Sequence, residues 1–453
     1  MHGTSFAAVL GRLVWSPPLT VLFLAVGLLC TIRLRFFQFR RPDRWLGGTI
    51  QALLRRGDGH GLSRRQAAAT ALSATVGTGN IAGVASAIAF GGPGAVFWMW
   101  VAAALGMATA YCENVLGVRY RRLDGQGGPM EYLTRGLRAR PLAVWFCLCC
   151  AASSLGLGCM VQSSAVAEAM QGWLGVPGWI SGLVLALGAG VVILGGVRRI
   201  GAVAEKLVPA MVGLYLAACA VCLFRGAARI PAAFAAIFSG AFQPLGIAGG
   251  LVGTTVRCGV SRGLFSNEAG LGSSVMVNCA APGSAAEQGQ LAMFEVFVDT
   301  LVVCTVTALT VLVSGVYDAA LYGAYPEAVG IPGGLLAGAP LTQAALRVGL
   351  GTSGGAVLAI CLSLFAFSTL LGWSWYGRRA VGWLFGVRAA RLYCVLFVLL
   401  TGLGAVLRSE MVWNLSDAAN GLMAVPNLIA VVLLPVSRQK RASAHCGSGP
   451  RLL

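Results

Sequence analysis

The stretch Ala74-Thr75-Val76-Gly77-Thr78-Gly79-Asn80 lies in the middle of an apolar segment, residues 68–91, that is long enough to cross a bilayer. Its two glycines each destabilise a helix interior by about 1 kcal/mol relative to alanine. Its threonines and asparagine also bring polar groups to membrane depth, where unsatisfied groups are costly. We therefore predict that the helix breaks here. Irregular backbone at that depth persists where it packs in protein or lines a polar cavity, which favours a binding site over a plain helix-packing contact.

The composition indicates a membrane protein throughout. The 453 residues are 57% hydrophobic and 11% charged, with a mean hydropathy of +0.79, whereas soluble domains carry about 25% charged residues. The net charge of +18 could suit nucleic acid, but the arginines cluster in short connections and are not interleaved with aromatic residues, so no nucleic-acid partner is expected. The cysteines are scattered through apolar runs with only three histidines in the chain to help them bind metal, and we interpret them as small buried apolar residues.

The chain divides into about eleven apolar segments, each a predicted transmembrane helix. Their ranges are 15–37, 68–91, 95–118, 142–170, 175–196, 203–224, 245–280 with an interruption, 291–316, 340–376 with a long or broken helix, 389–408 and 413–436. Basic residues gather in alternate connections, for example 33–67 and 119–141, and the connection 317–339 has none. The positive-inside rule then predicts an N-terminus outside and a cytoplasmic tail, 437–453, which fits a multi-pass protein of a bacterial inner membrane.

A second interruption, around residues 257–270, follows the first after five spans. A repeat with an odd number of spans must insert upside down relative to its partner. The sequence therefore predicts one integral domain of two inverted five-helix halves, 68–224 and 245–436, preceded by an extra helix, 15–37.

Carboxylates within the apolar segments are functional candidates by default. Glu268 lies in the second interruption, and either acts in transport or pairs with Arg262 or Arg257 as a structural clasp. Glu295 and Asp299 share a helical face because they are four residues apart.

For Asp299 we favour a structural pair with an arginine of the seventh span, and a proton or cation role is the alternative. Glu113 lies near a span end, where headgroups and a neighbour such as Arg119 would satisfy it.

Four blocks of sequence resemble the alanine or glycine:cation symporter family, also called the sodium:alanine symporters. They are ATVGTGNIAGVASAIAFGGPGAVFWMW (74–100), GGPMEYL (127–133), RGLFSNEAGLGS (262–273) with FVDTLVVCTVTAL (297–309), and FAFSTLLGWSWYG (365–377) with GLMAVPNLIA (421–430). The resemblance implies a LeuT-type fold of inverted repeats with an extra first helix. It also implies import of a small neutral amino acid coupled to sodium or, less often, another cation.

The resemblance also implies a substrate site at the two interruptions. Amides exposed at the first break would hold the substrate carboxylate at a helix N-terminus, Ser266 and Asn267 would receive the ammonium, Phe265 would cover the side chain, and Trp373 would close the pocket. The predicted substrate residues are Thr75, Gly77, Thr78, Gly79, Asn80, Phe265, Ser266, Asn267, Thr369, Gly372 and Trp373.

The resemblance to LeuT-type transporters further implies a sodium ion between the first break and the span that contains Ser368 and Thr369. Their hydroxyls, with the backbone carbonyls near Ser73 and Val76, would supply the oxygens that a hard cation prefers. The alternative is that both hydroxyls bond back to their own helix.

Other functions fit the residues less well. An enzyme would need a catalytic constellation, and the predicted spans contain no histidine and no acidic cluster with metal-ligand spacing. A channel would show a lining ring or filter. A transporter of the same fold that runs on protons, or one that carries a different small solute, is the nearer alternative. No cofactor is expected beyond the co-transported ion, and the oligomeric state and the choice among alanine, glycine and serine stay open.

Overall fold

A computed structural model describes residues 14–15, 17–54, 63–122, 126–242, 251–318, 335–407 and 410–435, and in these residues the secondary structure is entirely helical. Six helices in the described part of the chain are long and apolar enough to cross a membrane, or seven when one bent pair counts as a single span. Three shorter apolar helices accompany them. The prediction of an all-α polytopic membrane protein is confirmed.

Most helices coincide with predicted spans. In chain order these are α2 (Pro17–Arg33), α5 (Arg64–Thr75) with η2 (Gly79–Gly83) and α6 (Val84–Gly91), α7 (Gly94–Arg119), α9 (Arg140–Leu155) with η4 (Gly156–Met160) and α10 (Val161–Leu174), α11 (Gly178–Ile193), α12 (Val197–Arg225), α15 (Leu251–Asn267) with α16 (Val275–Asn278), α17 (Ala285–Val296) with η6 (Phe297–Cys304) and α18 (Thr305–Ser314), α21 (Ser353–Gly404) and α22 (Glu410–Leu433). Shorter helices in the connections are α3 (Phe37–Arg40), η1 (Asp43–Gly47), α4 (Gly48–Leu54), α8 (Pro129–Glu131), η3 (Tyr132–Gly136), η5 (Ala227–Arg229), α13 (Ile230–Ala241) and α20 (Gly338–Leu350).

The first helix break lies where the sequence predicts it. Helix α5 starts at a capping box, in which Ser63 and Gln66 each bond the other's backbone. It ends at Val76, whose φ of −76° and ψ of 89° are not helical. The chain resumes in η2 at Gly79, and the two parts are bent by 46°.

The second break lies further along the chain than predicted. Helix α15 continues to Asn267, and the irregular segment covers residues 268–274 before α16 begins. Three residues there have positive φ: Glu268 (55°), Gly270 (88°) and Gly272 (78°). Two of the three are glycines, which adopt this conformation without a steric penalty, so they place the break. Residues 245–250 of the predicted span lie outside the described residues.

The boundaries of the ninth and tenth predicted spans are wrong. Residues 338–350 form α20, which ends at Gly351 with φ 68°, and the spanning helix α21 starts at Ser353. Helix α21 then runs through both predicted spans, with a non-helical turn at Gly386 (φ 85°, ψ 179°). The predicted tail, 437–453, and most of the connection 317–339 lie outside the described residues.

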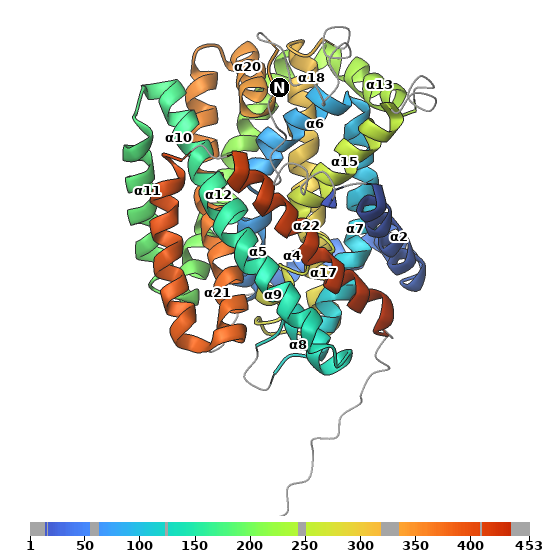
Figure 1. The fold of residues 1–453 in the computed structure, drawn as a ribbon. Helices are drawn as coiled ribbons and strands as arrows, with labels where there is room; N and C mark the ends of the chain where they lie inside the picture. The colour runs from blue at the N-terminus through green and yellow to red at the C-terminus, as the bar shows by residue number, and fades with distance from the viewer. Residues whose placement is uncertain are drawn as a thin grey trace, which may run out of the picture.

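The helices pack side by side into one bundle (Figure 1). Helix α2 lies at its edge against α7, and α6, α13, α18 and α20 gather at one end, while α8 lies at the opposite end. Buried apolar side chains from α2, α7, α9, α15, α21 and α22 form the largest core cluster. Both helix breaks are enclosed by this packing, which is the surrounding that irregular backbone needs at membrane depth.

Candidate functional site

The two helix breaks lie against each other. A Cβ built on Gly79 of the first break would stand 3.5 Å from the Phe265 ring and 4.0 Å from the Cα of Ser266, just before the second. Because Gly79 lacks a side chain, the two backbones approach closely at this point. The predicted substrate residues from the two interruptions are thus brought together.

Asp299 links the two breaks by hydrogen bonds. Asn80 Nδ2 donates to its Oδ1 at 2.7 Å, and the hydroxyls of Ser266 and Thr300 donate to its Oδ2, each at 2.8 Å. All four side chains are buried. The favoured interpretation, a pair with an arginine of the seventh span, is wrong, because three neutral donors surround this carboxylate instead.

Within the first break, side chains replace the missing helical hydrogen bonds. Gly77 N–H donates to Asn80 Oδ1 at 2.8 Å, and Thr78 donates to Gln162 Oε1 on α10 at 3.0 Å. Thr75 bonds back to carbonyls of its own helix at 3.4 Å. Asn80 therefore fixes the turn through its amide oxygen and reaches Asp299 through its nitrogen.

Helix α21 covers the first break from the side predicted for sodium. The Ser368 hydroxyl lies 3.3 Å from the Ser73 carbonyl oxygen and 2.8 Å from that of Phe365. The Thr369 hydroxyl bonds Phe365 O at 3.0 Å, and a Cβ on Gly77 would stand 2.5 Å from it. The hydroxyls thus bond back to their own helix, as the alternative interpretation of this pair expects, and they also face the first break, where the sodium site stays a prediction.

The same face of α21 extends to Gly372 and Trp373. A Cβ on Gly372 would lie 2.6 Å from that of Ala74, so α21 and α5 cross closely there. Trp373 is buried against Gly158 of η4, and its carbonyl accepts from Ser154 at 2.7 Å.

Phe265 is half-buried and contacts both Gly79 and the Arg262 guanidinium, with Arg262 Cζ 5.9 Å from the ring centroid. Asn267 donates to Thr300 Oγ1 at 3.1 Å, while its own oxygen accepts from Ala269 N–H at 3.0 Å. The last residues of α15 therefore contact both the first break and η6.

The carboxylates of Glu268 and Glu295 are buried and accept hydrogen bonds from neutral groups. Glu268 accepts from the Ser273 hydroxyl across the second break, in place of the predicted partners Arg262 or Arg257. Glu295 accepts from Asn278 Nδ2 at 2.9 Å. Each of these two bonds joins the polypeptide on the two sides of a bend or connection.

The sequence interpretation misplaces Glu113. This residue is fully buried on α7, where its Oε1 accepts from Gly270 N–H at 3.0 Å and its Oε2 accepts from Asn427 Nδ2. These two buried partners take the place of the headgroups and of Arg119, which are expected for Glu113 from the sequence. A carboxylate and an asparagine inside apolar segments are the available signal, and only the fold shows that they meet.

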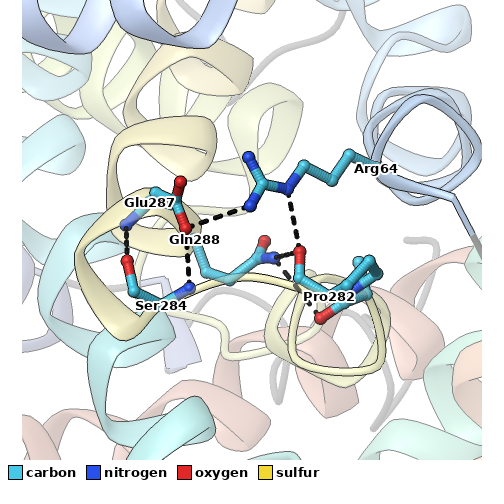
Figure 2. A network of polar contacts seen from close by, with 6 residues as sticks. Arg64, Pro282, Ser284, Glu287 and Gln288 are labelled. Atoms are coloured by element: carbon cyan, nitrogen blue, oxygen red, sulfur yellow. Dashed lines mark hydrogen bonds and ion pairs between the residues drawn. The ribbon is translucent and has the colours of Figure 1, made fainter. Parts of the chain in front are cut away.

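A polar network joins the first residues of α5 to the first residues of α17 (Figure 2). Arg64 donates to Glu287 Oε2 at 3.1 Å and to Pro282 O at 2.9 Å. Glu287 and Ser284 form the capping box of α17. A cavity of about 150 Å³ adjoins this network, and its walls include Gly48 of α4 as well as Arg64 and Glu287.

The fold has solved counterparts. The chain superposes on the crystal structure of MhsT in complex with L-phenylalanine with a TM-score of 0.58, over 83% of this chain and 90% of that one, at 15% sequence identity. Two broken helices that meet inside a helical bundle, together with this likeness, define the LeuT-type fold.

The family follows from the sequence comparisons. The profile described as "Sodium:alanine symporter family" matches residues 2–443, and this protein belongs to that family. It is 41% identical to the sodium/alanine symporter AgcS of Methanococcus maripaludis, over 96% of this chain and 95% of AgcS. It is 37% identical to a putative sodium/proton-dependent alanine carrier, YrbD, of Bacillus subtilis, over 95% and 90% of the two chains. The protein is a transporter and not an enzyme.

Proposed function

We propose that this protein carries alanine or glycine together with sodium into the cell by alternating access. The observation that carries the proposal is the meeting of the two helix breaks, at which Gly79 faces Phe265 and Asp299 joins Asn80 to Ser266. Backbone amides at the first break suit a carboxylate, apart from those of Gly77 and Asn80, which bond Asn80 Oδ1 and Gly77 O. Carbonyl and side-chain oxygens at the end of α15 suit an ammonium. An amino acid presents both groups.

The pocket proposed here selects small side chains. Phe265 stands 3.5 Å from the position of a Gly79 Cβ, so little room remains between the breaks. We assign the opposite wall to Trp373, which lies on the face of α21 that crosses α5 and packs against Gly158, while its carbonyl accepts from Ser154. Leucine would be excluded by steric overlap, because a missing methylene group alone is worth only about 1–3 kcal/mol.

Sodium is assigned to the space between the first break and α21. Its oxygens are the carbonyls of Ser73 and Val76 and the hydroxyls of Ser368 and Thr369. The 3.3 Å approach of the Ser368 hydroxyl to Ser73 O supports this set, because the groups already converge. Ion and substrate share the unwound backbone, so binding of either one orders the site for the other. Each therefore raises the affinity for the other by the same factor.

Asp299 supports a second candidate, coupling to protons or to a further cation at the other side of the break. Its carboxylate is buried and its three partners are neutral donors, so a cation or a proton would meet no competing positive group among these contacts. Glu268 and Glu295 are weaker candidates for the same role, because their bonds to Ser273 and Asn278 do not reach the first break.

The proposed placement follows the charge pattern of the chain: two inverted halves, 68–224 and 245–436, after an extra helix, in a bacterial inner membrane with the N-terminus outside. The substrate class is tested by exchange of labelled alanine in proteoliposomes. Unlabelled glycine, alanine and serine should compete, and leucine should not. Competition by leucine as strong as by alanine would contradict the proposed pocket.

A further inference from the structure

The peptide groups of the second break need partners because helical hydrogen bonds are lost there. Gly270, with φ 88°, lies in the middle of this segment. Its N–H donates to Glu113 Oε1 at 3.0 Å, and its carbonyl accepts from Asn427 Nδ2 at 2.8 Å. Backbone groups left unpaired at membrane depth are strongly destabilising. Two side chains from α7 and α22 thus supply both hydrogen bonds of this residue's backbone.

These side chains also bond each other. Asn427 Nδ2 donates to Glu113 Oε2, and the Tyr132 hydroxyl donates to Asn427 Oδ1. An asparagine side chain has two N–H donors and one carbonyl oxygen. Both donors are used, one on Glu113 and one on Gly270, and the oxygen receives Tyr132. All three side chains are fully buried, so the network fixes the orientation of the amide.

The surroundings leave the break little freedom. A Cβ on Gly272 would stand 2.6 Å from Pro129 Cγ and 3.0 Å from the Asn427 side chain, and one on Gly270 would stand 2.7 Å from the Phe23 ring. The network therefore holds the backbone immediately after Ser266 and Asn267, and Ala269 N–H bonds Asn267 Oδ1 at 3.0 Å. Movement of Gly270 would be transmitted directly to the end of α15.

We propose that Glu113 and Asn427 are positioning residues, which hold the second helix break in the conformation that receives the substrate. This inference rests on the proposed function, because it assigns the end of α15 to the substrate ammonium. Glu113 and Asn427 act through the backbone of Gly270 and do not belong to the proposed sodium site, which lies at the first break and α21.

The first test is Glu113→Gln. The carboxamide keeps an oxygen for Gly270 N–H but turns an N–H₂ group toward Asn427 Nδ2, so two donors face each other. Alanine affinity of the purified protein should fall by about tenfold, the effect of leaving a buried polar group unpaired. Sodium affinity measured without alanine should stay within about twofold of wild type, since the first break is untouched.

Asn114→Ala is the matched control. Asn114 is the next residue on α7 and is equally buried, and its amide nitrogen bonds Ala110 O within the same helix. Its removal should leave alanine affinity within about twofold of wild type. Tyr132→Phe is the variant that preserves packing if Glu113→Gln fails to fold. It removes the donor that orients Asn427 and should weaken alanine binding about threefold.

A double variant separates positioning from general damage. When Glu113→Gln is combined with Asn427→Asp, the introduced carboxamide on α7 can donate to the introduced carboxylate on α22. The link between the two helices then returns, while Gly270 O stays without its donor. Alanine affinity of the double variant should exceed the value expected from adding the two single effects.

Additive effects, an unchanged alanine affinity in Glu113→Gln, or equal losses of alanine and sodium affinity would overturn the assignment. Wild-type protein that binds sodium but no alanine would instead overturn the proposed function, and this inference with it.

Discussion

At the scale of single residues, the glycines of the first break decide how closely the two broken helices approach. The sequence predicts Gly79 as a site residue because an intramembrane glycine beside threonine and asparagine is unfavourable in a plain helix. The fold adds its neighbour, since Phe265 lies 186 positions later in the chain and a Cβ on Gly79 would contact it at 3.5 Å. A pattern of neighbouring residues in the sequence cannot indicate this contact.

Gly79→Leu should abolish alanine binding, because a leucine side chain would fill the space beside Phe265 that the carboxylate must reach. Gly79→Ala is the matched control. At 3.5 Å its methyl group makes an ordinary contact, so alanine affinity should fall by no more than about tenfold. Equilibrium binding to the purified variants measures both. Affinity of the wild-type strength in Gly79→Leu would remove this segment from the substrate site.

Phe265→Ala should widen the range of transported amino acids. Removing the ring opens space beside Gly79, whose Cβ would stand 3.5 Å from the ring. Valine and leucine should become competitors of alanine exchange, with apparent affinities improved by about tenfold or more. If both remain excluded, Phe265 does not set the size limit.

The Ser368→Ala, Thr369→Val double variant tests the sodium assignment. Both hydroxyls face the first break. Loss of two of the proposed oxygen ligands should lower the affinity for sodium by at least about tenfold. Alanine affinity should fall mainly at low sodium concentration, because the two sites are linked. Titration of alanine binding against sodium measures both effects. An unchanged sodium dependence would exclude this site.

The carboxylates mark the limit of residue-level prediction. Asp299, Glu268 and Glu113 stand out as unusual in an apolar chain, but the partners expected for them from the sequence are wrong. Charges nearby in sequence suggest arginines, whereas the fold supplies Asn80, Ser273 and Asn427. Neutral donors carry no charge signal, so the sequence pattern could not indicate these pairs.

At the scale of elements, helix breaks are easier to predict than helix ends. The first break coincides with its glycines, and the second lies at residues 268–274, later than expected, because α15 tolerates Gly259 and Gly263 within its length. Both of these glycines pack against α7: a Cβ on Gly259 would stand 2.3 Å from Ala95 O, and one on Gly263 would stand 3.3 Å from the Cα of Met99. Close helix packing therefore explains glycines that look like breakers in the sequence.

Hydropathy does not separate helices α13 and α20 from their surroundings. Each is short, at 12 and 13 residues, and lies beside longer apolar segments, so the sequence merges α20 into a span and assigns α13 to a connection. Length is the distinguishing feature, since a span needs about 20 residues.

The network in Figure 2 yields a prediction for the ends of α5 and α17. Glu287→Gln keeps the capping box, which accepts either residue, and removes only the ion pair with Arg64. The pair is partly exposed, so it stabilises this end by about 0–1 kcal/mol. Backbone hydrogen exchange in residues 281–290 should accelerate by up to about fivefold.

Asp43→Asn is the control for this experiment, because it removes the exposed pair that Arg41 forms with Asp43 in a different connection. Exchange in residues 281–290 should then match wild type. Equal exchange in the Glu287→Gln variant and in wild type would show that the ion pair does not stabilise the N-terminal ends of α5 and α17.

At the scale of the whole molecule, apolar segments and loop charge predict an all-α membrane protein with an extra helix before two broken ones. The helices of the described residues and the likeness to MhsT agree with the all-α membrane protein, while its division into inverted halves stays a prediction. What sequence patterns could not provide is the contact between the breaks, which depends on how α5, α15, η6 and α21 pack. The coupling proposed here is a property of that packing, because ion and substrate share one unwound segment.

We propose that a sodium gradient drives uptake of a small neutral amino acid by this protein. The direct measurement is labelled alanine uptake into proteoliposomes of the purified protein, with an inward gradient of sodium, of potassium, or of protons at equal membrane potential. If sodium drives uptake, alanine should accumulate transiently above its external concentration only with the sodium gradient. Accumulation that proceeds equally with potassium, or that requires the proton gradient alone, would contradict it.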